Sequence, residues 1–206
     1  DAYIYSALIR SCGELGQWEH SMSYFKQMIK HGMSPNQHCY SAAISACAKG
    51  GQWQQALQLL DEMQTEHVEA DAFCFNAAIS ACGKSGQLEK ALRLLDEMQR
   101  KGVEPDVFSF SAAISACRKA GQMEKALRLL DEMQRKGVEP NAHCFNAAIR
   151  VCSKGGQLEK ALRLLEEMQR KGIEPDVFSF NAAISACGKD GQSEQALKLL
   201  NEMKIK

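Results

Sequence analysis

Apolar residues recur along the chain with the spacing of short amphipathic helices. In one stretch they stand three or four residues apart, at Phe75, Ala78, Ile79 and Cys82. A second run with the same spacing extends over residues 88–98. Gly86 separates the two runs, and Gly102 followed by Pro105 ends the second, which is a typical helix stop. The pattern therefore predicts a helical hairpin with helices of roughly 12 and 14 residues.

The hairpin pattern returns with a strict period. The string beginning at Phe75 is repeated with few changes from Phe110, Phe145 and Phe180, 35 residues apart, and looser copies start at Tyr5 and Tyr40. No residues intervene between copies, so the chain divides into repeats 2–36, 37–71, 72–106, 107–141, 142–176 and 177–206. The turns between the two helices are expected at Gly16, Gly51, Gly86, Gly121, Gly156 and Gly191. We interpret residues 1–206 as one array of six repeats.

The fold class follows from the repeat. A lone hairpin cannot cover its apolar face, whereas stacked hairpins bury a continuous core. We therefore predict an all-α protein, a right-handed α-solenoid of six helix-turn-helix repeats.

Composition and charge argue against several classes of protein. The 206 residues are 45% hydrophobic and 24% charged, which argues against a disordered or collagen-like chain. No apolar run approaches about 18 residues, so we expect no membrane span. Twenty-five basic residues balance 25 acidic ones, so any anionic partner must be held by local features. The chain begins with Asp, not Met, and its first residues already belong to a helical pattern, so we expect it to be a processed or trimmed piece of a longer protein.

The repeat carries recognisable strings. It has F/Y-N/S near its start, CxKxGQ at the first turn, EKALxLLxEM in the second helix and KGVEPD at its end. A 35-residue unit with these strings resembles the pentatricopeptide repeat family. His67 in place of Gly and Ala70 in place of Pro depart from the pattern, which leaves the closing turn of the second repeat open. The resemblance implies a single-stranded RNA-binding protein of a mitochondrion or chloroplast.

The resemblance also implies which residues read the bases. In the family, the fifth residue of the first helix and the last residue of the repeat together select one base. The corresponding residues are Ser6 and Asn36, Ser41 and Asp71, Asn76 and Asp106, Ser111 and Asn141, Asn146 and Asp176, and Asn181 without a closing partner. By the family's rule they imply the target 5′-AGUAU(Y)-3′. Asp and Asn are also preferred helix N-caps, and the two roles are compatible.

The second residue of every repeat is a flat ring: Tyr3, His38, Phe73, Phe108, His143 and Phe178. Residues two apart on a helix point to different sides, so these rings and the aromatic residues two positions later cannot both face the core. We expect the later set to be core and the rings of the second residue to stack on bases. The alternative is that the rings of the second residue also belong to the core.

A lysine stands two residues before the turn glycine in five repeats, at Lys49, Lys84, Lys119, Lys154 and Lys189. We expect these lysines to contact phosphates, although a lysine at this place also complements the helix dipole. Five contacts would give a salt slope of about −3.5, from about −0.7 per phosphate.

The sequence contains no recognisable catalytic or metal-binding arrangement. The nine cysteines fall at two places of the repeat without a CxxC pair, and we expect buried free thiols. We therefore expect no enzymatic activity, no metal, no cofactor and no small-molecule substrate. The alternative to RNA binding is a helical-repeat scaffold that contacts protein subunits of a large organellar complex, such as a ribosome or a photosynthetic or respiratory assembly.

Overall fold

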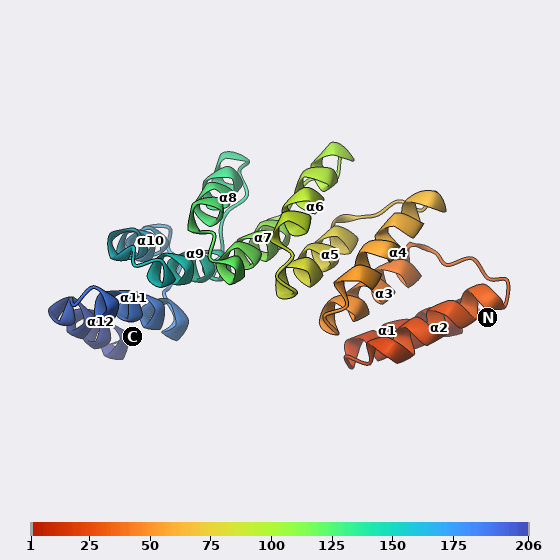
Figure 1. Cartoon of the computed structure of the whole chain (residues 1–206), viewed down its shortest axis with the longest axis horizontal. Helices are drawn as coiled ribbons and strands as arrows, with labels where there is room; N and C mark the ends of the chain where they lie inside the picture. Colours follow the sequence, from red (N-terminus) through yellow and green to blue (C-terminus); the bar gives the residue numbers. More distant parts are fainter. Residues whose placement is uncertain (1, 206) are drawn as a thin grey trace. The chain divides into compact units, whose positions relative to one another are not determined.

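The computed structural model describes residues 2–205, and this part of the chain folds into helices joined by short turns (Figure 1). The helices are α1 (Ala2–Glu14), α2 (Trp18–Lys30), α3 (Gln37–Lys49), α4 (Trp53–Thr65), α5 (Ala72–Lys84), α6 (Leu88–Arg100), α7 (Val107–Ala120), α8 (Met123–Arg135), α9 (Ala142–Lys154), α10 (Leu158–Arg170), α11 (Val177–Lys189) and α12 (Ser193–Ile205). Each odd-numbered helix begins at the first residue of a predicted repeat.

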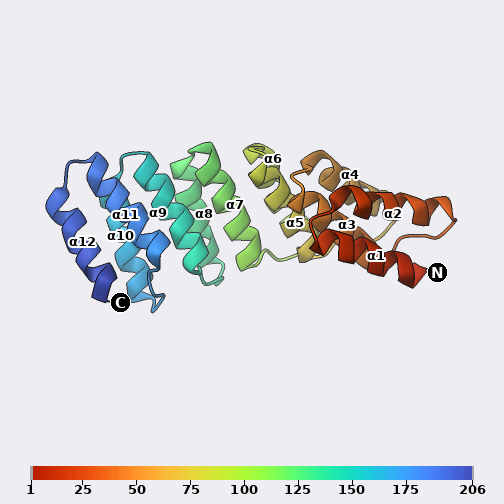
Figure 2. The ribbon, with the colours of Figure 1, turned by 90° about the horizontal axis from the view of Figure 1, so that it is seen from below.

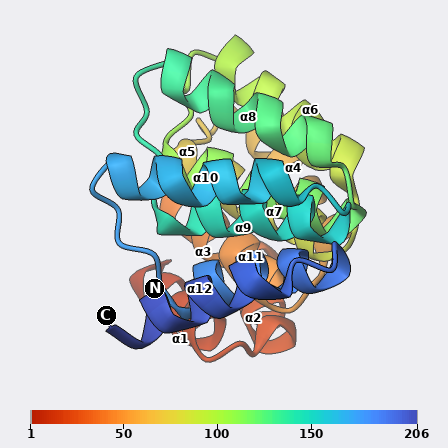
Figure 3. The same cartoon turned by 90° about the vertical axis from the view of Figure 1, so that its left-hand side faces the viewer.

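The chain divides into two compact units, one ending at Pro105 and the other beginning at Asp106. In the first unit, α3 packs against both α1 and α5; in the second, α9 packs against both α7 and α11. Within each unit, the second helix of a hairpin lies beside the first helix and also contacts the first helix of the next repeat, as α10 does with α9 and α11. Figure 2 shows the stacked hairpins of the second unit, and Figure 3 shows α9 and α10 side by side. The predicted all-α solenoid of stacked hairpins is confirmed.

The predicted turns also form. Gly16, Gly51, Gly86, Gly121, Gly156 and Gly191 all have φ values between 67° and 74°, in the left-handed region that favours glycine. The closing turns at Gly32, Gly102, Gly137 and Gly172 have the same geometry. In the second repeat His67 takes this place with φ of 55°, so the closing turn keeps its form without glycine.

Replacing His67 with glycine is expected to raise the free energy of unfolding by about 0.5–1 kcal/mol. A side chain in the left-handed region costs about 1–2 kcal/mol, and glycine removes this cost. Part of the gain is lost because glycine has greater conformational freedom in the unfolded chain. Urea unfolding followed by circular dichroism measures the change. His67→Ala is the matched control, since alanine keeps the Cβ atom. An equal gain in both variants would contradict a backbone origin.

In five of the six repeats, the aromatic residue two positions after the ring lies in the core. Phe75, Phe110, Phe145 and Phe180 are buried, as is Tyr40, and this part of the core prediction is confirmed. Tyr5 is only half-buried, and its hydroxyl is hydrogen-bonded to Nδ1 of His31 at 2.8 Å. Leucine, alanine and methionine side chains of the second helices complete the core.

The nine cysteines are free thiols, and eight of them are buried, while Cys12 is partly exposed. Burial raises the pKa of Cys47 and of Cys82 to about 11. For Cys74, burial together with the charge of Asp71 raises the pKa to about 12. These thiols are therefore protonated at neutral pH, as expected for packing residues.

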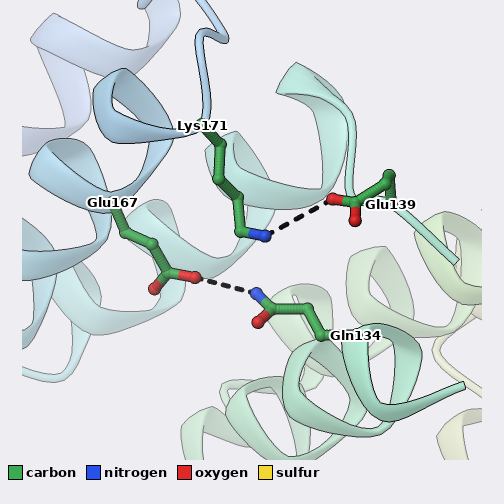
Figure 4. A network of polar contacts seen from close by, with 4 residues as sticks. All are labelled: Gln134, Glu139, Glu167 and Lys171. Carbon is green, nitrogen blue, oxygen red and sulfur yellow. Dashed lines mark hydrogen bonds and ion pairs between the residues drawn. The ribbon is translucent and has the colours of Figure 1, made fainter. Parts of the chain in front are cut away.

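Polar contacts link neighbouring second helices in the second unit (Figure 4). The amide of Gln134 donates to Glu167 at 2.8 Å, and the equivalent Gln169 donates to Glu202 at 2.7 Å. Lys171 pairs with Glu139 at 3.4 Å. The repeat period thus governs polar contacts between repeats as well as the apolar core.

Candidate functional site

The first helices present a row of rings to solvent within each unit. Phe73 is 57% exposed whereas Phe75, two residues later, is fully buried, and Phe178 and Phe180 differ in the same way. All of the second-residue rings are exposed: Tyr3, His38 and Phe73 in the first unit, and Phe108, His143 and Phe178 in the second. The alternative of a core role for these rings is therefore wrong. Their predicted stacking on bases stays a prediction.

In the first unit, rings and predicted base-reading residues line one hollow of about 640 Å³ on the face of α1, α3 and α5. The predicted residues that line it are Tyr3, Ser6, Asn36, His38, Ser41 and Phe73. Lys49 and Arg10 add positive charge to its wall, and Glu14 adds a negative one. The hollow therefore combines flat apolar surfaces with hydrogen-bonding groups.

The second unit has a corresponding hollow of about 500 Å³ on the face of α7, α9 and α11. Its predicted residues are Asn141, His143, Asn146, Asp176 and Phe178. The remaining predicted residues lie outside these two hollows: Asp71, Asn76, Asp106, Phe108, Ser111, Asn181, Lys84, Lys119, Lys154 and Lys189. About half of the site residues predicted from the sequence thus lie in these two hollows.

The closing residues cap the helices that follow them. The side chain of Asn36 accepts a hydrogen bond from the backbone N–H of Cys39, and Asp71, Asp106, Asn141 and Asp176 accept equivalent bonds. At Asp106 and Asp176 a serine three residues later completes a capping box, because its hydroxyl accepts from the backbone N–H of the aspartate. The capping role predicted from residue type is confirmed.

The fifth residue and the closing residue of the fifth repeat meet directly. The amide nitrogen of Asn146 lies 3.1 Å from both carboxylate oxygens of Asp176. The buried Ser179 hydroxyl donates to Asp176 at 3.0 Å and contacts the Asn146 carbonyl oxygen at 2.5 Å. Burial alone would raise the pKa of Asp176, but hydrogen bonds from Ser179, Asn146 and Phe178 hold it below its ordinary value. The carboxylate is therefore ionised and fixed in orientation.

The second repeat holds its site residues differently. Asp71 accepts a hydrogen bond at 2.8 Å from the side chain of Gln37, the first residue of the same repeat. The hydroxyl of Ser41 donates to the backbone carbonyl of His38 at 3.1 Å. Gln37 was not recognised in the sequence, although the other repeats have Ala or Val at this place.

The predicted phosphate-contacting lysines are exposed at the ends of the first helices. Lys49 lies 3.5 Å from the carbonyl oxygen of Glu14, and Lys189 lies 3.1 Å from that of Ser153. Both carbonyls belong to the end of the preceding first helix. These two lysines therefore complement a helix dipole, as the alternative reading proposed, and remain accessible to an anion.

Arginines line both hollows, although the sequence analysis gave them no role. Arg10 is found in the first hollow, and Arg118 and Arg150 in the second. Burial and the nearby charge of Arg150 lower the pKa of Arg118. These residues could have been found from the repeat itself, because Arg118 and Arg150 replace the small residues of most other repeats.

Other site types find no support in the part of the chain that the structure describes. Within residues 2–205, no group of three or more histidine, cysteine, aspartate or glutamate side chains is arranged to hold a metal ion. Among these same residues, no helix has the length and apolar content that a membrane span requires.

Comparison with known proteins identifies related repeats. A family model described as the pentacotripeptide-repeat region of PRORP matches residues 1–135 and 72–206, which together span the chain. No curated protein sequence matches. Among solved structures, the pentatricopeptide repeat protein PPR10 from maize superposes with a TM-score of 0.80 at 29% identity, covering 100% of this chain and 29% of PPR10.

Two further structures are similar. PPR10 in complex with an 18-nt psaJ RNA element matches with a TM-score of 0.70 at 28% identity, over 100% of this chain and 28% of PPR10. The repeat domain of Arabidopsis thaliana protein-only RNase P 1, in complex with tRNA, has a TM-score of 0.73 at 17% identity, over 82% of this chain and 89% of that domain. At 17% identity, the likeness to the repeat domain of RNase P 1 supports the fold alone. The chain spans less than a third of the length of PPR10.

Proposed function

The chain belongs to the pentatricopeptide repeat family, and from this premise we propose that it binds single-stranded RNA with selectivity for base sequence. The observation that carries the proposal is the shared location of two kinds of side chain. In each unit, exposed rings and small hydrogen-bonding residues line the same hollow on the first helices. Unstacked bases offer a flat face and a polar edge, so such a hollow can bind both parts of a base.

The rings supply affinity without selecting a base. Stacking of a base on an aromatic side chain is worth about 1–3 kcal/mol and tolerates any base, because every base has a π face. His38 and His143 support this role, since an exposed imidazole gains little from packing but stacks well on a base. Lys49 and the hollow-lining arginines would neutralise the phosphates that link the bases.

The polar residues supply selectivity. Asn can donate and accept at a pyrimidine edge, whereas Ser leaves room for a larger purine. Under the family's pairing rule, the repeats read A, G, U, A and U in order, followed by a pyrimidine at Asn181. The contact between Asn146 and Asp176 supports joint reading in the fifth repeat, because a fixed carboxylate orients the amide that would meet the base. The proposed target is therefore 5′-AGUAU(Y)-3′.

The biological setting is proposed from the relatives. Maize PPR10 has been crystallised with an 18-nt psaJ RNA element, so repeats of this form can hold single-stranded RNA. We place the chain in a mitochondrion or chloroplast, where it would act in the processing, stability or translation of a transcript. The free cysteines suit a compartment that keeps thiols reduced.

Fluorescence polarisation with labelled RNA tests the proposal. The probes are an AGUAUC-containing RNA, a shuffled RNA of the same length and the DNA version of the first. We expect the first to bind most tightly at low salt. If none of them binds below concentrations on the order of tens of micromolar, where non-specific binding begins, RNA binding is wrong for this chain and the protein-scaffold alternative is favoured.

The substitution Ser41→Asn is expected to change the preferred second base from G to U by about three- to tenfold, since a base-edge hydrogen bond contributes about 0.5–1.5 kcal/mol. Polarisation with RNAs that differ only at this base measures the preference. Ser45→Asn is the matched control, because Ser45 lines the same hollow on α3 outside the base-reading place. Unchanged preference with intact affinity would contradict the base code while leaving stacking in place.

A further inference from the structure

Two arginines from neighbouring helices line the hollow of the second unit. Arg118 lies near the end of α7 and Arg150 lies in α9, and these helices pack against each other. The same hollow is lined by the rings of His143 and Phe178. Two cationic groups therefore share one open cavity with the surfaces proposed to hold bases.

The fold does not need an arginine at either place. The residues equivalent to Arg118 in the other repeats are Gly13, Ala48, Gly83, Ser153 and Gly188. At Gly13 a Cβ atom would already meet the Cβ of Ala46 at 3.1 Å, so a small residue suits the packing there. The residues equivalent to Arg150 are Arg10, Ser45, Ser80, Ser115 and Ser185. The fourth and fifth repeats thus place a large cation on each side of one interface between repeats.

The positive charge of this pair is not neutralised by the protein. Within the described residues, neither guanidinium takes part in an ion pair or a hydrogen bond. The one carboxylate that lines the hollow, Asp176, is occupied by hydrogen bonds from Asn146 and Ser179. Two arginines near one carboxylate leave an excess of positive charge, and partial burial of Arg118 strengthens its field.

We propose that Arg118 and Arg150 together bind a phosphodiester group of the bound RNA strand, next to the base held by the fifth repeat. The inference rests on the proposed function. A guanidinium presents several N–H donors in one plane and matches phosphate oxygens in pairs. Two guanidiniums can therefore surround one phosphate, while His143 and Phe178 stack on the neighbouring base in the same hollow.

The double variant Arg118→Gln/Arg150→Gln tests the site, with AGUAUC-containing RNA and shuffled RNA as probes. Affinity for both RNAs is expected to fall by about tenfold at low salt, because charge-assisted hydrogen bonds are lost. The slope of log affinity against log salt is expected to become less steep by about 0.7, the value for one phosphate. The ratio of the two affinities stays the same, since phosphate contacts carry no base information.

Two further variants complete the test. Arg128→Gln removes an exposed arginine from α8 in the same unit and is expected to change neither affinity nor slope. Arg150→Gln alone, at an exposed side chain, gives a folded variant with part of the loss even if the double variant is unstable. If affinity and slope are unaltered while AGUAUC remains preferred, the phosphate site is wrong and the proposed function stands. If the unmodified protein binds neither RNA, both are wrong.

Discussion

Replacing His143 and Phe178 together by alanine is expected to weaken the binding of AGUAUC-containing RNA by at least about 30-fold, from about 1–3 kcal/mol for each stacked base. Both rings are exposed, lie on successive first helices and line one hollow. Their removal takes away the flat surfaces and leaves Asn146 and Asp176 in place. Polarisation at fixed salt measures the loss, and the salt slope is expected to stay constant because no charge–phosphate contact changes.

The matched control is the double variant His20→Ala/Leu197→Ala. It removes one histidine and one large apolar side chain, both exposed, from the second helices α2 and α12. RNA affinity is expected to be unchanged in this control. Equal losses in the two double variants would mean that the rings bind no bases and that exposed apolar surface alone drives association.

The substitution Phe145→Ala is expected to lower the free energy of unfolding by about 3–5 kcal/mol, which is the usual cost of truncating a buried phenylalanine. Phe145 is fully buried on α9, which contacts α7, α8, α10 and α11. The cavity therefore lies in a helix that packs against four others. Urea unfolding followed by circular dichroism measures the change, and the unfolding of α7–α12 is expected to shift most because each repeat is stabilised by its neighbours.

Phe178→Ala is the control for this prediction, because the same side chain is lost from an exposed place on α11. Its effect on stability is expected to stay within about 0.5 kcal/mol. The two phenylalanines thus separate packing from the proposed binding: the buried one is expected to affect unfolding and the exposed one RNA affinity. A large stability loss at Phe178 would contradict the division between the two sets of rings.

Most of the fold can be predicted from the sequence because the repeat is strict. The period places each first helix at the start of its repeat, and the glycine of each turn has the positive φ that explains its presence. Residues two apart on a helix point to different sides, so the sequence alone predicts that only one of Phe73 and Phe75 is buried. The division after Pro105 could not be predicted, since the repeat pattern runs through that point unchanged.

The candidate site is only partly predictable, for a different physical reason. Contacts between successive first helices, such as that of Asn146 on α9 with Asp176 at the start of α11, depend on how far one helix is displaced along the next. The bond between Gln37 and Asp71 depends likewise on where the chain places the two ends of one repeat. Arg118 and Arg150 do not follow from the repeat pattern, because most other repeats have a small residue at these two places. In a nearly uniform repeat, the exceptions carry as much information as the pattern.

The packing of first helices against one another within each unit has an evolutionary consequence. In the second unit, α9 packs against both α7 and α11, and the three helices have similar sequences. Recombination between the matching coding segments would insert or delete a whole repeat and recreate the same apolar interface at the junction. Under the proposed function, such an event lengthens or shortens the recognised RNA by one nucleotide without a folding penalty. Selection can then act on the base-reading residues of the new repeat alone.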